Sequence, residues 1–126
     1  MKSRIVIIDD DSDSLKLATY LLTHQGFQVQ SAQDGEAGLA LIYEVIPDII
    51  LSDVQLPKLT GLELVKKIKS NPAYQHIPMI AITAQCMAGD KENILAAGFD
   101  GYISKPIDPM EFTQQIIDLS QTVKSV

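Results

Sequence analysis

The chain of 126 residues lacks several features that define common classes of protein. It contains one cysteine, Cys86, so no disulfide can form within it, which agrees with a reducing cytoplasm. Its two histidines, His24 and His76, match neither the spacing of a metal site nor a catalytic triad, which favours plain surface positions. The first hydrophobic run stops at the aspartates that follow Ile8, so we expect no signal peptide and no membrane span.

Positive charge is also scarce. The sequence holds 10 Lys and Arg against 16 Asp and Glu, which gives a net charge of -6. Because no broad basic patch can form, we expect no nucleic-acid partner. Three lysines, Lys66, Lys67 and Lys69, do gather on one expected helix. We interpret them as the solvent-exposed face of that helix.

The composition is that of a soluble globular protein, with 46% hydrophobic and 21% charged residues. A chain of this length can bury a core without disulfides or structural metals, and we expect a single domain over residues 1–126. Only a short tail from Gln121 follows the last expected helix. We therefore expect no DNA-binding or catalytic output domain.

Strand-like and helix-like stretches alternate five times along the sequence. We predict strands at 4–8, 27–32, 48–52, 78–82 and 100–104, and helices at 12–25, 35–45, 61–70, 87–97 and 109–121. Alternating βα units of this kind predict an α/β fold with a right-handed, doubly wound parallel sheet of five strands. We expect the flavodoxin-like strand order 2-1-3-4-5.

Local signals agree with these elements. Gly26 and Gly98 are placed to end the first and fourth helices. Asp108, followed by Pro109, predicts an N-cap and a first helical residue for the last helix. The second strand alternates polar and apolar residues, whereas the first, third and fourth are continuously apolar. We therefore expect the second strand at an edge and the others covered on both faces.

Polar residues stand where four of the apolar runs end. They are Asp9 and Asp10, Asp53, Thr83, and Lys105. Ligands of open parallel sheets bind outside the carboxyl ends of the strands, so these side chains should share one small volume. Three close carboxylates resist joint ionisation unless a cation lies among them, and such hard oxygens suit Mg²⁺. The hydroxyl and the ammonium would suit an incoming phosphoryl group, which indicates a site for aspartate phosphorylation.

Four separated segments resemble the receiver domains of response regulators, in the right order and spacing over essentially the whole chain. They are Ile5-Val6-Ile7-Ile8-Asp9-Asp10; Pro47-Asp48-Ile49-Ile50-Leu51-Ser52-Asp53 with Leu56-Pro57 and Gly61; Ile77-Pro78-Met79-Ile80-Ala81-Ile82-Thr83-Ala84; and Gly98-Phe99-Asp100-Gly101-Tyr102-Ile103-Ser104-Lys105-Pro106. The departures are small: Leu56 and Thr60 stand where Met and Asp are common in the family.

The resemblance implies a response regulator of a two-component or phosphorelay pathway. Asp53 would be the phosphoacceptor, taking its phosphoryl group from a phosphohistidine on a histidine kinase or a histidine phosphotransfer protein. Asp10, Asp53 and the Gln55 backbone carbonyl would ligate Mg²⁺, with Asp9 acting largely through bound water. The protein would be a regulator rather than an enzyme, although it would promote its own phosphorylation and dephosphorylation.

The resemblance also assigns the switch. Lys105 would pair with one phosphoryl oxygen, while the Thr83 hydroxyl and the Ala84 amide would bind another. Movement of Thr83 would open space for Tyr102 and alter the surface that a downstream protein binds. Gln55 and Gln85 resemble positions that tune the attack of water on the acyl phosphate.

Three alternatives fit less well. An aspartate-nucleophile phosphatase would use Asp9-x-Asp11, but that family expects Thr or Val where the chain has Asp13. A flavodoxin-like FMN carrier needs a phosphate loop rich in Ser, Thr and Gly, and the acidic loop here would repel phosphate. A calcium loop starting at Asp9 fails because Ser14 replaces the required glycine and Tyr20 the required glutamate.

Helical spacing suggests a docking surface beside the acidic site. At about 100° per residue, Leu17, Ala18, Leu21 and Leu22 fall on one stripe of the first helix, and Leu15 lies about 90° from its centre. We therefore expect Leu15 to be exposed and to form, with Pro106, an apolar rim for the phosphodonor. An isolated surface leucine is an equally simple explanation of Leu15.

Overall fold

The computed structural model describes residues 3–84 and 88–124. Its elements follow in the order β1 (Arg4–Ile8), α1 (Ser12–His24), β2 (Gln28–Ala32), α2 (Gly35–Val45), β3 (Ile49–Ser52), α3 (Gly61–Lys69), β4 (Met79–Thr83), α4 (Ala88–Ala97), β5 (Gly101–Ser104) and α5 (Phe112–Lys124). The strands form a parallel sheet in the order β2-β1-β3-β4-β5. This confirms the predicted α/β architecture and strand order. No helix in the described residues has the length and hydrophobicity needed to cross a bilayer.

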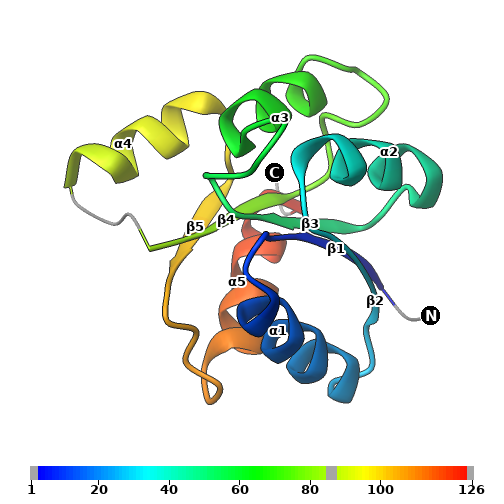
Figure 1. Ribbon diagram of the computed structural model, residues 1–126, viewed down its shortest axis with the longest axis vertical. Helices are drawn as coiled ribbons and strands as arrows, with labels where there is room; N and C mark the ends of the chain where they lie inside the picture. The colour runs from blue at the N-terminus through cyan, green and yellow to red at the C-terminus, as the bar shows by residue number, and fades with distance from the viewer. Residues whose placement is uncertain (1–2, 85–87, 125–126) are drawn as a thin grey trace.

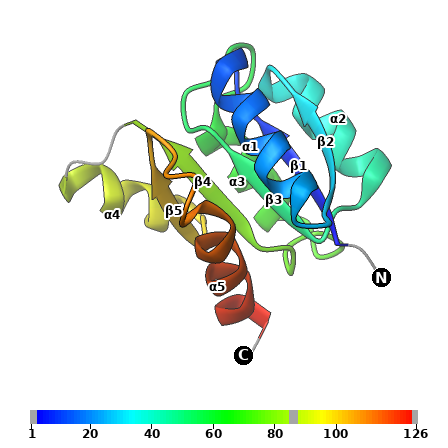
Figure 2. The same ribbon diagram turned by 90° about the horizontal axis from the view of Figure 1, so that it is seen from below.

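The sheet is the middle of three layers. Helices α1 and α5 cover one face, and α2, α3 and α4 cover the other (Figures 1 and 2). Two buried clusters correspond to these faces, one with Ile42 of α2 and Leu64 of α3, the other with Leu22 of α1 and Phe112 of α5. Because both faces are buried, the residues of β1, β3 and β4 are almost all buried, as their apolar runs predicted.

The second strand lies at an edge of the sheet, also as predicted. Gly26 and Gly98 have positive φ angles of 97° and 123° just after α1 and α4, where a helix end favours glycine. The start of α5 differs from the prediction. A turn precedes the helix, which begins at Phe112 rather than at 109, although the Asp108 carboxylate still accepts a hydrogen bond from the Met110 N–H (2.9 Å).

An ion pair links α3 to the amino ends of β4 and β5. Lys69, the last residue of α3, donates to the Asp100 carboxylate (2.8 Å) and to the carbonyl of Ile77 (2.8 Å). The same Asp100 oxygen accepts the N–H of Met79, the first residue of β4 (2.8 Å). Since hydrogen bonds to charged groups are the stronger ones, this contact fixes α3 against β4 and the approach to β5.

Candidate functional site

The backbone of the sheet brings the predicted polar residues to one edge. Each of three residues that directly follow a strand donates its N–H to a neighbouring strand: Asp9 to Ala32 of β2 (3.1 Å), Asp53 to Ile8 of β1 (2.9 Å), and Lys105 to Thr83 of β4 (2.9 Å). These bonds continue the ladders beyond the last strand residues. The site is therefore held by the sheet itself rather than by free loops.

The side chains of these residues form a bonded group. The ammonium of Lys105 lies 2.8 Å from Asp53 Oδ2 and 2.9 Å from Asp9 Oδ2. The other oxygens are also held, because Asp53 Oδ1 accepts the Gln55 N–H (3.1 Å) and Asp9 Oδ1 accepts the Asp11 N–H (3.0 Å). Both carboxylates therefore have fixed orientations.

Asp10 completes the acidic group from a more exposed position. Asp9, Asp10 and Asp53 each place one carboxylate oxygen within 4.8 Å of the others. Three carboxylates and the Lys105 ammonium leave two net negative charges when all are ionised. Hard oxygen ligands carrying this excess charge fit Mg²⁺, and a hollow of about 440 Å³ beside them is lined by Asp10 and Gln55 among others.

Two opposing effects set the pKa values of Asp9 and Lys105: burial of the charged group and its hydrogen bonds. Burial raises the pKa of the Asp9 carboxyl, and its hydrogen bonds with the Asp11 N–H and with Lys105 only partly offset that rise. Burial acts to lower the pKa of Lys105, but its hydrogen bonds with Asp53 and Asp9 outweigh that effect and raise this pKa. Lys105 therefore stays charged.

The remaining predicted residues surround this group. Thr83 is buried at the end of β4, Ala84 beyond it is exposed, and Lys105 is followed by the exposed Pro106 through a cis peptide bond. Tyr102 is half-buried on β5, and the Lys91 ammonium lies 5.3 Å from its ring centroid. Gln85 lies outside the described residues.

The loop after Asp53 depends on Thr60 and Gly61, at the start of α3. Thr60 is the N-cap of α3 and forms a capping box with Glu63, which the Thr-x-x-Glu spacing could have predicted. Gly61 donates its N–H to the Val54 carbonyl (2.9 Å), and a side chain on Gly61 would collide with the backbone oxygen of Asp53. Only glycine lets α3 begin this close to the site.

The predicted exposure of Leu15 is wrong. Leu15 is 8% exposed and belongs to the core cluster that also contains Phe112 and Ile107. The buried stripe of α1 is centred on Leu15, Ala18 and Leu22, while Leu17 is 36% exposed. The error arises because helical spacing locates an apolar stripe but does not fix the direction in which α1 packs, and Leu15 belongs to the buried cluster that α1 shares with the sheet and α5. The expected rim of Leu15 and Pro106 does not exist.

Replacement of Leu15 should therefore affect stability. We expect Leu15→Ala to lower the free energy of unfolding by about 2–4 kcal/mol, because it leaves a cavity in the buried cluster beside α1. Leu17→Ala is the matched control and should cost about 1 kcal/mol or less. Urea unfolding of both variants measures the difference, and equal losses would contradict this packing of α1.

Replacement of Asp9 should change how stability depends on pH. In the absence of divalent cations, we expect Asp9→Asn to raise the free energy of unfolding at neutral pH, because it removes a buried charge. A raised pKa in the folded state means that the native protein loses stability as pH rises above the ordinary value of 3.8. The difference in the free energy of unfolding between the variant and the native protein should therefore vanish at low pH and grow as the pH rises. Unfolding curves across this range test the trend, and a variant less stable at neutral pH would refute it.

Comparison with known proteins agrees with this geometry. Residues 5–117 match the model of the response regulator receiver domain. The polar-differentiation response regulator DivK of Brucella anthropi is 39% identical over 116 residues, which cover 92% of this chain and 94% of that protein. Among solved structures, the chemotaxis response regulator CheY4 of Vibrio cholerae is 26% identical with a TM-score of 0.89, over 94% of this chain and 99% of that one.

A second similar structure contains a metal. The receiver domain of the sensor histidine kinase PA1611 from Pseudomonas aeruginosa PAO1, with a magnesium ion coordinated in its active-site cleft, has a TM-score of 0.86. It is 26% identical, and the match covers 96% of this chain and 99% of that one. A phosphatase or an FMN carrier is not favoured by these matches. The chain belongs to the receiver domain family and is a phosphoacceptor response regulator with a regulatory, non-enzymatic role.

Proposed function

We propose that Asp53 accepts the phosphoryl group. The observation that carries this assignment is that Asp53 combines a fixed carboxylate with contact to the cation of the site. Its Oδ1 is held by the Gln55 N–H and its Oδ2 faces the Lys105 ammonium. Asp9 is also paired with Lys105 but is more buried, at 3% against 9% exposed, whereas Asp10 is exposed. Asp53 therefore combines a fixed carboxylate with more exposure than Asp9.

In the transfer step, a carboxylate oxygen of Asp53 forms a bond to phosphorus while the bond from phosphorus to the donor's imidazole nitrogen breaks. The nitrogen keeps the bonding electron pair and takes up a proton from solvent, and Asp53 becomes an acyl phosphate. Lys105 then exchanges its contact with Asp53 for one with a phosphoryl oxygen. Because Asp53 is oriented before the donor arrives, little ordering is needed in the reaction.

We assign the metal site to Asp10, Asp53 and the Gln55 carbonyl, with Asp9 acting largely through water. A bound Mg²⁺ supplies positive charge for the carboxylates and for the phosphoryl oxygens. The excess of two negative charges in the group supports a divalent ion rather than a monovalent one. By holding the metal, these residues promote both the phosphorylation and the dephosphorylation of the protein.

The switch that we propose couples the site to the surface around β5. The Thr83 hydroxyl and the Ala84 N–H bind a phosphoryl oxygen, and Thr83 moves toward it. Tyr102 lies on the neighbouring strand, where it is in register with Ala81 of β4. Its half-buried ring can turn into the space that Thr83 leaves, and this changes the surface presented to a downstream protein.

The phosphodonor is a histidine kinase or a histidine phosphotransfer protein in the cytoplasm, and residues 1–126 act as one receiver domain. Pro106, exposed directly after Lys105, remains our proposed contact for the donor protein. On α1, we propose that the exposed Leu17, rather than Leu15, contacts the donor protein.

The competing use of Asp9-x-Asp11 in a phosphatase is not supported, because Asp11 caps α1 and accepts hydrogen bonds from Asp13 and Ser14.

Labelling with a small phosphodonor tests the acceptor. With acetyl phosphate and Mg²⁺, Asp53→Asn should abolish radiolabelling, since an amide cannot attack phosphorus at this rate. Asp11→Asn is a suitable control, because asparagine also caps a helix and Asp11 lies outside the carboxylate group. Its labelling should match the native protein. Undiminished labelling of Asp53→Asn would disprove the assignment.

Calorimetric titration with Mg²⁺ tests the metal site. Asp10→Ala should weaken Mg²⁺ affinity at least about tenfold, because a charged ligand is lost, and should slow phosphorylation by acetyl phosphate. The variant should also be more stable without Mg²⁺, since like-charge repulsion falls. Asp13→Ala removes a nearby exposed carboxylate from outside the cluster and should leave affinity within about twofold. Equal affinities of the two variants would rule out ligation by Asp10.

A further inference from the structure

The edge strand β2 has main-chain groups on its open side. In a parallel ladder, successive residues direct their N–H and C=O alternately to the two sides of the strand. The Gln28 N–H donates to Ser3 (2.9 Å) and the Ala32 carbonyl accepts from Asp9 (3.1 Å), so Gln28, Gln30 and Ala32 face β1. The main-chain groups of Val29 and Ser31 must therefore face outward. In the described part of the chain, no strand lies beyond β2.

The features that usually protect such an edge are missing from β2. Natural edge strands are blunted by charged residues, proline, bulges or short length. Residues 27–32 contain no charge and no proline, and β2 pairs with β1 in an unbroken register over five residues. The other edge strand, β5, is shorter and is followed at once by Lys105 and Pro106.

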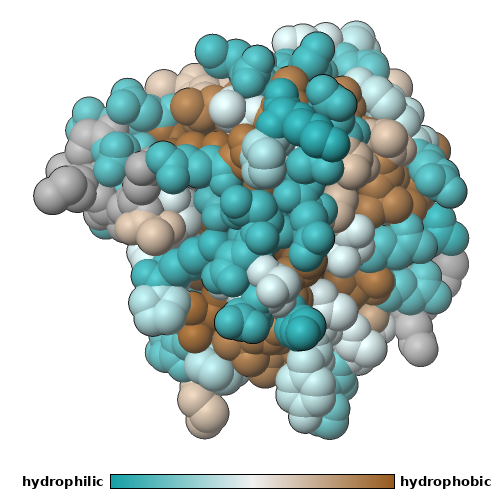
Figure 3. All heavy atoms as spheres, viewed as in Figure 1, coloured by the Kyte–Doolittle hydropathy of each residue, from teal (hydrophilic) through white to brown (hydrophobic). Residues whose placement is uncertain are grey.

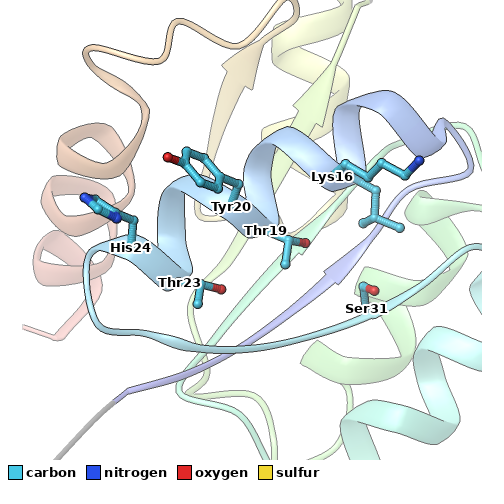
Figure 4. A pocket seen from close by; sticks show the side chains of 7 residues that line it. Lys16, Thr19, Tyr20, Thr23, His24 and Ser31 are labelled. Carbon is cyan, nitrogen blue, oxygen red and sulfur yellow. The ribbon is translucent and has the colours of Figure 1, made fainter.

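Hollows flank β2 on both faces. On the α1 face, a groove of about 780 Å³ runs between α1 and β2, and the side chains of Thr19 and Thr23 point into it, as does Ser31 from β2 (Figure 4). On the α2 face, a second hollow of about 320 Å³ is lined by Gln28 and Gln30 among others. An added strand directs alternate side chains to opposite faces, so each face has room for them.

The charge of the groove indicates what kind of segment fits. Its described lining includes the basic residues Lys16 and His24 and no acidic one, although the chain as a whole carries a net charge of -6. Lys16 and His24 are eight residues apart on α1, about 12 Å, which an extended segment of about four residues spans. Figure 3 shows that hydrophilic side chains also cover much of the face viewed in Figure 1.

We propose that β2 is a docking edge for an extended, acidic segment of a partner protein, which adds a sixth strand to the sheet. The segment pairs with the outward main-chain groups of Val29 and Ser31 and places an acidic side chain near Lys16. A second copy of this chain fits less well. Pairing through the uncharged residues 27–32 would bring no acid to Lys16, and two copies with a net charge of -6 repel each other.

Synthetic peptides test this proposal on the full chain. One blocked heptapeptide alternates threonine and valine with aspartate at two positions, and its matched partner has lysine at those positions. In NMR titrations, the aspartate peptide should slow hydrogen exchange of the Val29 and Ser31 amides on the order of tenfold at saturation. It should bind about fivefold more tightly than the lysine peptide at low salt.

Matched variants separate edge pairing from general attraction. Ser31→Pro removes one outward N–H without touching the ladder to β1 and should abolish binding, whereas Ser31→Ala keeps that N–H and should bind normally. Lys16→Glu should reverse the preference between the peptides, and Lys67→Glu on the distant α3 should not. If Ser31→Pro fails to fold, the Lys16→Glu comparison still decides. Asp53→Asn should leave binding unchanged, so this test is independent of the phosphoacceptor.

Several results would overturn the proposal: no binding of the aspartate peptide, equal binding of both peptides, or binding that survives in Ser31→Pro. Protection of the Val29 and Ser31 amides that rises with protein concentration, without peptide, would also overturn it. That result would assign the edge to a second copy of the chain.

Discussion

The functional end of this protein depends on the contact of one ammonium group with two carboxylates. Asp9, Asp10 and Asp53 meet at the carboxyl ends of β1 and β3, and without positive charge their repulsion would oppose the fold. Lys105, delivered by β5, lies within 2.9 Å of Asp9 and 2.8 Å of Asp53. Because one cation cannot balance three anions, the site keeps an excess of negative charge, which is the property that selects a divalent metal.

The rest of the fold keeps these groups in place. Backbone bonds continue the sheet through Asp9, Asp53 and Lys105, so the charged residues have no freedom to separate. The absence of a side chain at Gly61 lets α3 start against the backbone of Asp53. The molecule therefore holds an electrostatically unfavourable group in a fixed geometry, which is the condition under which a site responds strongly to a bound cation or a phosphoryl group.

Sequence reasoning was reliable where topology decides the outcome. Five strand-like stretches alternating with helices predicted a flavodoxin-like strand order, and that order brings Asp9 and Asp53 side by side. It failed where packing between distant elements decides. The burial of Leu15 depends on how α1 packs against the sheet and its neighbours, which helical spacing along α1 alone does not determine. Neither the bridging contact of Lys105 with Asp9 nor the open groove beside β2 could be derived from periodicity, because both depend on side chains from separate elements.

The most direct test of the central claim is to locate the phosphoryl group chemically. The native chain is phosphorylated with acetyl phosphate and Mg²⁺, the acyl phosphate is reduced with borohydride, and the modified peptide is identified by mass spectrometry. The geometry predicts one phosphoryl group per chain and reduction of residue 53 to homoserine. Modification at Asp9 or Asp10, or at a residue away from the carboxylate group, would contradict the account.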